Sequence, residues 1–242
     1  VLVFCSFNLF GQALKPLLIQ AGVYKVNNTK STANELLGLS RIFDIQGIPY
    51  QIFENPEELS NYSTVFTAGT LLDNDIDHTV LNHLYDFVEA GGVLVSSGQI
   101  GKQLFPLFGV TSYVPSRKRY RIHFEGSDPA MQYIDRPEEL TISLGNGEQH
   151  FYDEIIWTHG YKLMVNSRSL AVFDDKTSAF SRAQYGRGIT YLMGVTYTDM
   201  VLIPQLGQDY EAQRKYVNSF EPSADVIMLI LKSIYQTYNK PY

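Results

Sequence analysis

The stretch from Asp73 to Gly101, DNDIDHTVLNHLYDFVEAGGVLVSSGQIG, decides the fold class of this chain. It predicts a helix, because apolar residues recur at helical spacing and Asp73 or Asp75 can cap the first turn. Gly91-Gly92 ends the helix, since glycine adopts a left-handed backbone without a steric clash. Val93-Leu94-Val95 then forms a short apolar run, which is typical of a parallel strand covered on both faces.

A polar turn, Ser96-Ser97-Gly98-Gln99, follows directly after this predicted strand. Open α/β sheets place their binding or catalytic turns just beyond the carboxyl ends of parallel strands. The chemistry available at Ser97 therefore decides much of the functional argument.

The residues before this stretch repeat the same alternation of strands and helices. A helix is expected to start at a cap on Ser31 or Thr32 and to end at Gln46, where Gly47 follows. Its predicted apolar face is Leu36, Leu39, Ile42, Phe43 and Ile45. Strands are expected at residues 16–22, 49–53 and 64–68. This order predicts a parallel sheet with right-handed crossovers.

The pattern changes after Gly101. Residues 112–156 are strand-like and broken by turn signals, so we expect an antiparallel β insertion at about residues 112–165. Further strands are expected at residues 170–173, 181–185 and 189–195, and a final helix begins near Pro222. We predict an α/β fold for residues 14–242 as a single domain: a flavodoxin-like parallel sheet flanked by helices, with the antiparallel insertion.

Composition excludes several classes of protein. A formal net charge of -6 argues against a dedicated nucleic-acid binder. The single cysteine, Cys5, excludes a disulfide within the chain and a cysteine-based zinc site. No stretch reaches the ~20 apolar residues that span a bilayer. The apolar residues 1–13 suggest the end of a signal peptide, or alternatively a first core strand, and the former predicts a secreted or periplasmic protein.

Three segments together resemble the class I glutamine amidotransferase-like superfamily. They are the segment 59–69, the helix and strand of residues 73–95 that contain Glu89-Ala90-Gly91-Gly92, and the strand entry Tyr185-Gly186-Arg187-Gly188. The resemblance is to a non-catalytic branch that stands at the N-terminus of bacterial polysaccharide-processing proteins, often before a polysaccharide deacetylase module. It implies an accessory role beside a downstream catalytic domain.

That superfamily uses a cysteine nucleophile on the turn after the strand, with a histidine and an acid from a later strand. Here Ser96-Ser97-Gly98 occupies the turn, and the later segment Gly194-Val195-Thr196-Tyr197-Thr198-Asp199 contains no histidine. Two required parts are absent, so we do not expect glutaminase activity.

Ser97 acting as a serine nucleophile is the alternative, and it requires an adjacent imidazole base. His78 and His83 lie on the predicted helix, which favours a solvated position. His123, His150 and His159 are the candidates that could reach the turn. A histidine nitrogen within about 3 Å of the Ser97 hydroxyl would support this hypothesis.

The sequence gives little support to a metal site or a phosphate site. The turn Gly98-Gln99-Ile100-Gly101 is too short to be a phosphate-binding fingerprint. His150, Asp153 and Glu154, like Asp174-Asp175, lack the paired spacing of zinc or calcium ligands, so we expect no metal and no cofactor. The segment Arg117-Lys118-Arg119, with Arg121, is a compact basic patch on an acidic protein. A polyanion or an acidic partner surface is one interpretation of it, and a solvated loop is the favoured one.

The favoured function is therefore a non-catalytic accessory domain that binds glycan or packs against a catalytic domain. The binding rim is expected where the carboxyl ends of the parallel strands meet. Its predicted residues are Gly69, Thr70, Ser96, Ser97, Gly98, Gln99, Tyr197, Thr198 and Asp199. The alternatives are a serine hydrolase acting through Ser97 and a purely structural interaction domain.

Overall fold

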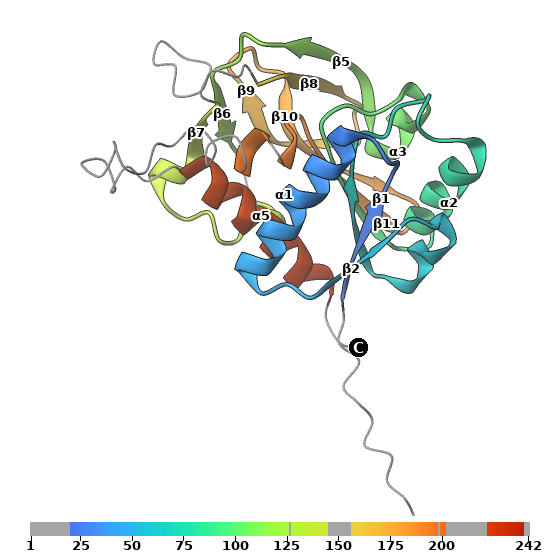
Figure 1. Ribbon diagram of the computed structural model, residues 1–242. Helices are drawn as coiled ribbons and strands as arrows, with labels where there is room; N and C mark the ends of the chain where they lie inside the picture. The colour runs from blue at the N-terminus through green and yellow to red at the C-terminus, as the bar shows by residue number, and fades with distance from the viewer. Residues whose placement is uncertain (1–19, 126, 145–155, 198, 202–221, 240–242) are drawn as a thin grey trace, which may run out of the picture.

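A mixed β-sheet forms the centre of the protein (Figure 1). The structure is a computed structural model that describes residues 20–125, 127–144, 156–197, 199–201 and 222–239. One half of the sheet is parallel, in the order β2-β1-β3-β4-β11. Its strands are β1 (Ala21–Lys25), β2 (Tyr50–Phe53), β3 (Thr64–Ala68), β4 (Val93–Ser97) and β11 (Gly188–Met193).

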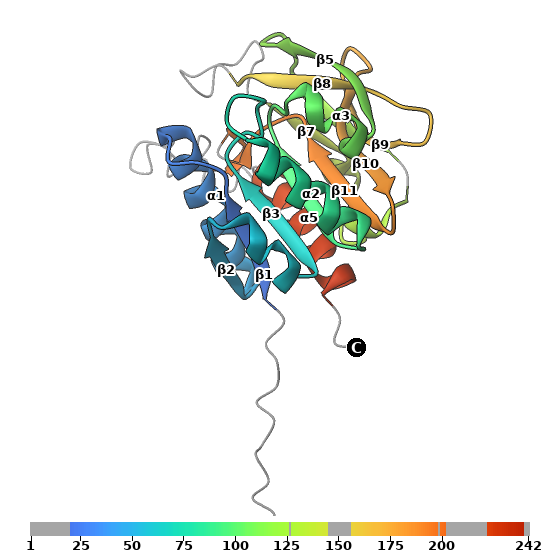
Figure 2. The same ribbon diagram turned by 90° about the vertical axis from the view of Figure 1, so that its right-hand side faces the viewer.

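The other half continues from β11 in antiparallel pairing, in the order β10-β9-β6-β7. Its strands are β10 (Ser178–Tyr185), β9 (Arg168–Phe173), β6 (Arg121–Phe124) and β7 (Thr141–Ser143). Off this path, β5 (Val110–Ser116) and β8 (Thr158–Leu163) pair with each other as an antiparallel ribbon, and β8 also touches β10. Figures 1 and 2 show this ribbon at the top of the molecule, beyond the ends of the parallel strands.

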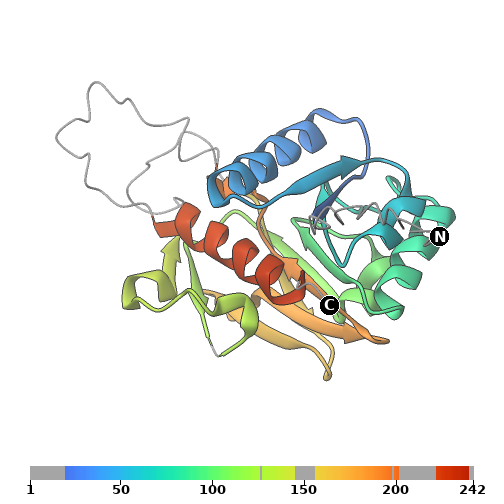
Figure 3. The ribbon, with the colours of Figure 1, turned by 90° about the horizontal axis from the view of Figure 1, so that it is seen from below.

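Helices cover both faces of the sheet. The helices α1 (Lys30–Gln46) and α5 (Pro222–Tyr238) lie side by side on one face, as Figure 3 shows from below. The other face carries α2 (His78–Glu89) and the short α3 (Phe105–Phe108). Short 3-10 turns complete the connections: η1 (Pro56–Asn61), η2 (Lys102–Leu104), η3 (Pro129–Met131) and η4 (Pro137–Leu140).

Alternating side chains divide the interior into two apolar clusters. In β4, Val93 and Val95 belong to the cluster under α1 and α5, whereas Leu94 belongs to the cluster under α2. In β11, Met193 belongs to the cluster under α1 and α5, and Leu192 belongs to the cluster under α2. Successive residues of a strand point to opposite faces, so an apolar run of this kind requires cover on both sides. The predicted α/β fold, with its flanked parallel sheet and antiparallel part, is confirmed.

Several local predictions need correction. The first described strand begins at Ala21, later than the predicted start at residue 16; residues 1–19 lie outside the described part of the chain. The cap of α1 is Thr29, rather than Ser31 or Thr32, and its side chain accepts a hydrogen bond from the amide of Thr32. Ile45 is 59% exposed and does not belong to the buried face of that helix. No helix in the described ranges is long and apolar enough to cross a membrane.

The cap of α2 is Asp77, rather than Asp73 or Asp75. Asp77 accepts a 2.8 Å hydrogen bond from the amide of Val80. Asp73 instead accepts from the amides of Lys102 and Gln103, at 3.1 and 3.2 Å, and so ties the loop after β3 to the loop after β4. The sequence pattern was ambiguous because three aspartates alternate before the helix, and each has the side chain of a good cap.

The cap assignment predicts different costs for two neighbouring substitutions. Asp77→Ala should lower the free energy of unfolding by about 1 kcal/mol, because it removes the acceptor for the first-turn amide. Asp75→Ala serves as the control and should change this free energy by less than about 0.5 kcal/mol. Urea denaturation of both variants measures the difference, and equal losses would contradict the assignment.

Candidate functional site

The structure brings together the three loops that were predicted to form a rim. A Cβ atom placed on Gly98 would lie 3.0 Å from Cγ2 of Thr196 and 3.7 Å from Cγ2 of Thr70. These residues follow β4, β11 and β3, three adjacent parallel strands whose carboxyl ends lie at one edge of the sheet. The loops therefore meet at the place where α/β sheets bind their ligands.

Only part of this rim is accessible. Ser96, Ser97 and Tyr197 are buried, with 0%, 3% and 0% of their surface exposed, and Gly69 and Gly98 are buried as well. Thr70, Gln99 and Asp199 are partly exposed, and Thr198 lies outside the described residues. A ligand resting on the rim would thus meet Thr70 and Gln99, while the buried side chains support the loops from beneath.

Glu35, which the sequence patterns did not single out, organises the buried layer. Its carboxylate accepts a 3.1 Å hydrogen bond from the hydroxyl of Ser97 and a 3.2 Å bond from the amide of Tyr197, both through Oε2. Glu35 is 3% exposed and comes from α1, so one carboxylate joins α1, the end of β4 and the start of the segment after β11. Burial raises the pKa of the Tyr197 hydroxyl well above its ordinary value, and the negative charge of Glu35 raises this pKa further.

Gly98 occupies the tight turn itself. Its φ of +72° lies in the left-handed region, and its amide donates to the carbonyl of Met193 at 2.9 Å. The carbonyl of Gly98 accepts a hydrogen bond from the Tyr161 hydroxyl. The residue at the sharpest point of the turn therefore has no side chain, and the neighbouring Ser97 points into the protein.

The serine hydrolase hypothesis finds no histidine base among the described residues. The Ser97 hydroxyl donates to the carboxylate of Glu35. The ring nitrogens of His123 contact Thr141 and Asp174, and the ring of His159 packs against Tyr113. His78 and His83 lie on α2, as predicted, and His150 lies outside the described residues. Among the described histidines, none makes a hydrogen bond with Ser97 that would activate it.

Aromatic side chains of the β5–β8 ribbon lie beside the rim and form an aromatic wall, which consists of Tyr113, His159 and Tyr161. The side-chain amide of Gln99 donates to the Tyr113 hydroxyl on β5. The Tyr113 ring lies 5.7 Å from the ring of His159 and 6.3 Å from that of Tyr161, both on β8. Of these residues the sequence suggests Gln99, as part of the rim, and His159; Tyr113 and Tyr161 lie in segments that look like ordinary half-buried strands.

His159 is held in its neutral form. Burial, and secondarily the positive charge of Arg119, lowers the pKa of His159 from 6.5 to about 4. Its Nδ1 is buried without a hydrogen-bond partner among the described residues. At neutral pH this residue therefore contributes a polar, uncharged ring to the wall.

The basic patch is smaller than the sequence suggested. Arg119 is 1% exposed, and its guanidinium donates to Asp175 Oδ2 at 2.7 and 2.9 Å and to the carbonyl of Val114 at 2.9 Å. This buried arginine therefore connects β5 of the ribbon to Asp175 by hydrogen bonds. Arg117 and Lys118, in contrast, are exposed.

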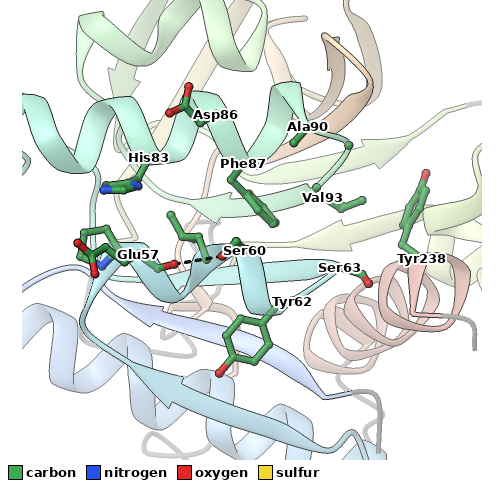
Figure 4. A pocket seen from close by; sticks show the side chains of 14 residues that line it. Glu57, Ser60, Tyr62, Ser63, His83, Asp86, Phe87, Ala90, Val93 and Tyr238 are labelled. Atoms are coloured by element: carbon green, nitrogen blue, oxygen red, sulfur yellow. Dashed lines mark hydrogen bonds between the residues drawn. The ribbon is translucent and has the colours of Figure 1, made fainter. Parts of the chain in front are cut away.

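A separate groove lies at the opposite edge of the sheet. It has a volume of about 610 Å³ and lies between η1 and α2, where His83 points toward Glu57 (Figure 4). It opens at the amino ends of β3 and β4, away from the edge where α/β sheets hold ligands. No group of His, Cys, Asp and Glu side chains in the described residues could hold a metal ion.

Comparisons with known proteins show the fold but no family. No protein-family model and no curated protein sequence matches the chain. Among solved structures, the cytoplasmic protein STM3548 from Salmonella typhimurium is 10% identical, with a TM-score of 0.56, over 90% of this chain and 98% of that one. A putative ThuA-like protein from Bacteroides uniformis is also 10% identical, with a TM-score of 0.54 and 90% of both chains covered.

The same fold occurs as one part of longer glycosidases. A β-galactosidase from Bacillus circulans is 14% identical, with a TM-score of 0.54, over 81% of this chain but 31% of that one. The exo-β-1,4-mannosidase Op5Man5 from an Opitutaceae bacterium is 11% identical, with a TM-score of 0.55, over 90% of this chain and 35% of that one. This chain thus spans about a third of the length of the glycosidases that it matches.

The role of Glu35 predicts a large loss of stability on truncation. Glu35→Ala should lower the free energy of unfolding by about 2–4 kcal/mol, because the Ser97 hydroxyl and the Tyr197 amide would lose their buried acceptor. Glu54→Ala is the matched control: it removes an exposed ion pair with Lys25 and should cost less than about 1 kcal/mol. Chemical denaturation measures the free energy of unfolding of both variants. Similar losses would contradict the role of Glu35 as the buried acceptor that joins these elements.

The lowered pKa of His159 predicts a pH dependence of stability. Between pH 6.5 and about 4 the unfolded chain binds a proton at this residue and the folded protein does not. Stability is therefore lost as the pH falls through this window, by at most about 1.4 kcal/mol per pH unit. His159→Asn should remove this part of the slope and His78→Asn should retain it, as measured by denaturation at several pH values; identical slopes in both variants would contradict the prediction.

Proposed function

We propose that this chain is a non-catalytic accessory domain of a carbohydrate-active protein, which binds glycan at the rim formed by Thr70 and Gln99 or packs there against a catalytic domain. One observation carries the proposal. The turn after β4, where the resembling superfamily keeps its nucleophile, has Gly98 at its tip and a Ser97 hydroxyl tied to the buried Glu35. The rim lies where α/β sheets bind their ligands, and its turn exposes no nucleophile.

The solved structures support the accessory part of the proposal. In glycosidases of two kinds, a β-galactosidase and an exo-β-1,4-mannosidase, the matching fold makes up about a third of the chain. A domain of this architecture is therefore compatible with a place beside a catalytic domain that acts on sugars. At identities of 14% and 11% the similarity shows the fold, and the accessory role is our proposal.

We further propose that the companion is a polysaccharide-processing module of the deacetylase type, and that the protein works outside the cytoplasm. The first part rests on the sequence resemblance described above, and the second on the apolar residues 1–13. Neither depends on the geometry of the rim.

Two alternatives give different outcomes. A hydrolase acting through Ser97 requires that its hydroxyl leave Glu35, become accessible and meet a base. A purely structural domain requires no ligand, and substitutions on the exposed rim would then have no effect on any binding reaction. The partly exposed Gln99 is the side chain that best separates these alternatives.

The proposal predicts sugar binding that depends on Gln99. Titration of the isotope-labelled protein with β-1,4-linked galactose and mannose oligosaccharides, followed by NMR, should shift the resonances of the rim. Gln99→Ala should weaken binding by about tenfold, which corresponds to the loss of one hydrogen-bonding side chain. Gln51→Ala, on the exposed edge strand β2, is the matched control and should leave the affinity unchanged.

Two results would overturn the proposal. Turnover of p-nitrophenyl acetate that Ser97→Ala abolishes would show a hydrolase. Absence of binding to every oligosaccharide, together with no association between this domain and a polysaccharide deacetylase module, would leave a structural role elsewhere.

A further inference from the structure

A row of aromatic and polar rings follows one face of the β5–β8 ribbon. Tyr161 and His159 lie two residues apart in β8 and share a face, because side chains alternate along a strand. Trp157 comes directly before the strand, two residues from His159, and continues this spacing. The antiparallel register places Tyr113 opposite Tyr161 and Pro115 opposite His159. The row becomes more exposed along its length, from the buried Tyr161, through the half-buried His159, to Trp157 with 47% of its surface exposed.

The inner end of this row reaches the rim. The Tyr161 hydroxyl donates to the carbonyl of Gly98, and the side chain of Gln99 donates to the Tyr113 hydroxyl. The row is therefore continuous with the accessible rim residue Gln99. Figures 1 and 2 both place the ribbon beyond the carboxyl ends of the parallel strands.

A cation marks the outer end of the row. The guanidinium carbon of Arg117 lies 4.0 Å from the centroid of the Trp157 ring. This stacking orients the guanidinium while leaving its N–H groups available to a ligand. Within the described residues, Arg117 and its exposed neighbour Lys118 have no carboxylate partner.

The acids of the adjacent turn do not neutralise this charge by direct contact. Asp175 is bound by the buried Arg119 at 2.7 Å. Asp174 accepts from the amides of Tyr120 and Arg121 and lies 3.4 Å from His123. The outer end of the row therefore presents an oriented cation beside a large exposed aromatic ring, on a protein whose net charge is -6.

We propose that the row formed by Trp157, His159 and Tyr113, with Arg117 at its outer end, is a subsite for an acidic saccharide that bears carboxylates, such as a uronic acid oligomer. The inference rests on the proposed glycan binding and adds the class of glycan and the residues that select it. Apolar faces of sugar rings pack on aromatic side chains, while the Arg117 guanidinium pairs with a carboxylate in a bidentate geometry. The half-buried His159 adds an uncharged ring to the row, beside Tyr113.

An acidic peptide is the competing occupant of a basic aromatic surface. The described row favours a saccharide because its members are planar rings with polar edges, and this pattern continues to the rim amide of Gln99. A peptide that satisfied only Arg117 and Lys118 would leave the Tyr113 and His159 part of the row unused. The two occupants thus differ in their dependence on the aromatic residues.

The test uses the intrinsic fluorescence of Trp157, which is the only tryptophan in the chain. A galacturonic acid hexamer should change this emission saturably and bind at least about tenfold more tightly than a neutral galactose oligomer of equal length, as expected for one charge-assisted pair. Added salt should reduce this preference. Arg117→Ala should abolish it, whereas Arg41→Ala, an exposed arginine on α1, should preserve it.

Calorimetry with Trp157→Ala, whose side chain is exposed and whose loss should not unfold the protein, should show weaker binding of both oligomers by about tenfold. Equal affinities for the acidic and neutral oligomers, with no effect of Arg117→Ala, would overturn this inference and leave the proposed glycan binding intact. Equally tight binding of polyglutamate that survives Trp157→Ala would also overturn it, in favour of an acidic protein partner. Failure of both oligomers to bind, together with absence of binding in the galactose and mannose titrations described above, would remove the glycan function as well.

Discussion

The rim of this protein depends on one buried carboxylate. Glu35 belongs to α1, yet it holds the hydroxyl at the end of β4 and the amide at the start of the segment after β11. A buried acceptor that serves two donors on different elements fixes their spacing more strictly than apolar contacts do, because hydrogen bonds are sensitive to distance and angle. The loops that carry Gly98 and Thr196 can therefore meet, and the ribbon tyrosines can reach the turn.

The architecture was predictable from the sequence because it is encoded locally. Glycine stops, helical spacing and apolar runs identify β3 and β4 almost to the residue, and parallel order follows from the alternation of elements. The cap of α2 was not predictable, since choosing among Asp73, Asp75 and Asp77 requires the path of a loop that also binds Lys102. Local patterns specify which element forms, and tertiary contacts decide where it begins.

The site was harder to predict because its partners are distant in the sequence. In the sequence Arg119 resembles part of a solvated basic loop, yet it is buried and donates hydrogen bonds to Thr158 and Asp175. The sequence does carry a signal for Glu35: Thr32, Glu35, Leu39 and Ile42 recur at helical spacing, and all are buried. An acid on the apolar side of a helix indicates a buried partner, which in this protein is the end of β4.

The left-handed backbone at Gly98 also bears on the balance between stability and reactivity. Side-chain-bearing residues store strain of about 1–3 kcal/mol in such conformations, and many active sites retain that strain because it aims a reactive group. Glycine adopts a φ of +72° at little steric cost, so this turn holds its left-handed backbone in a relaxed form. In this chain the glycine at the tip of the turn is thereby a source of robustness, because the turn holds its shape without stored strain.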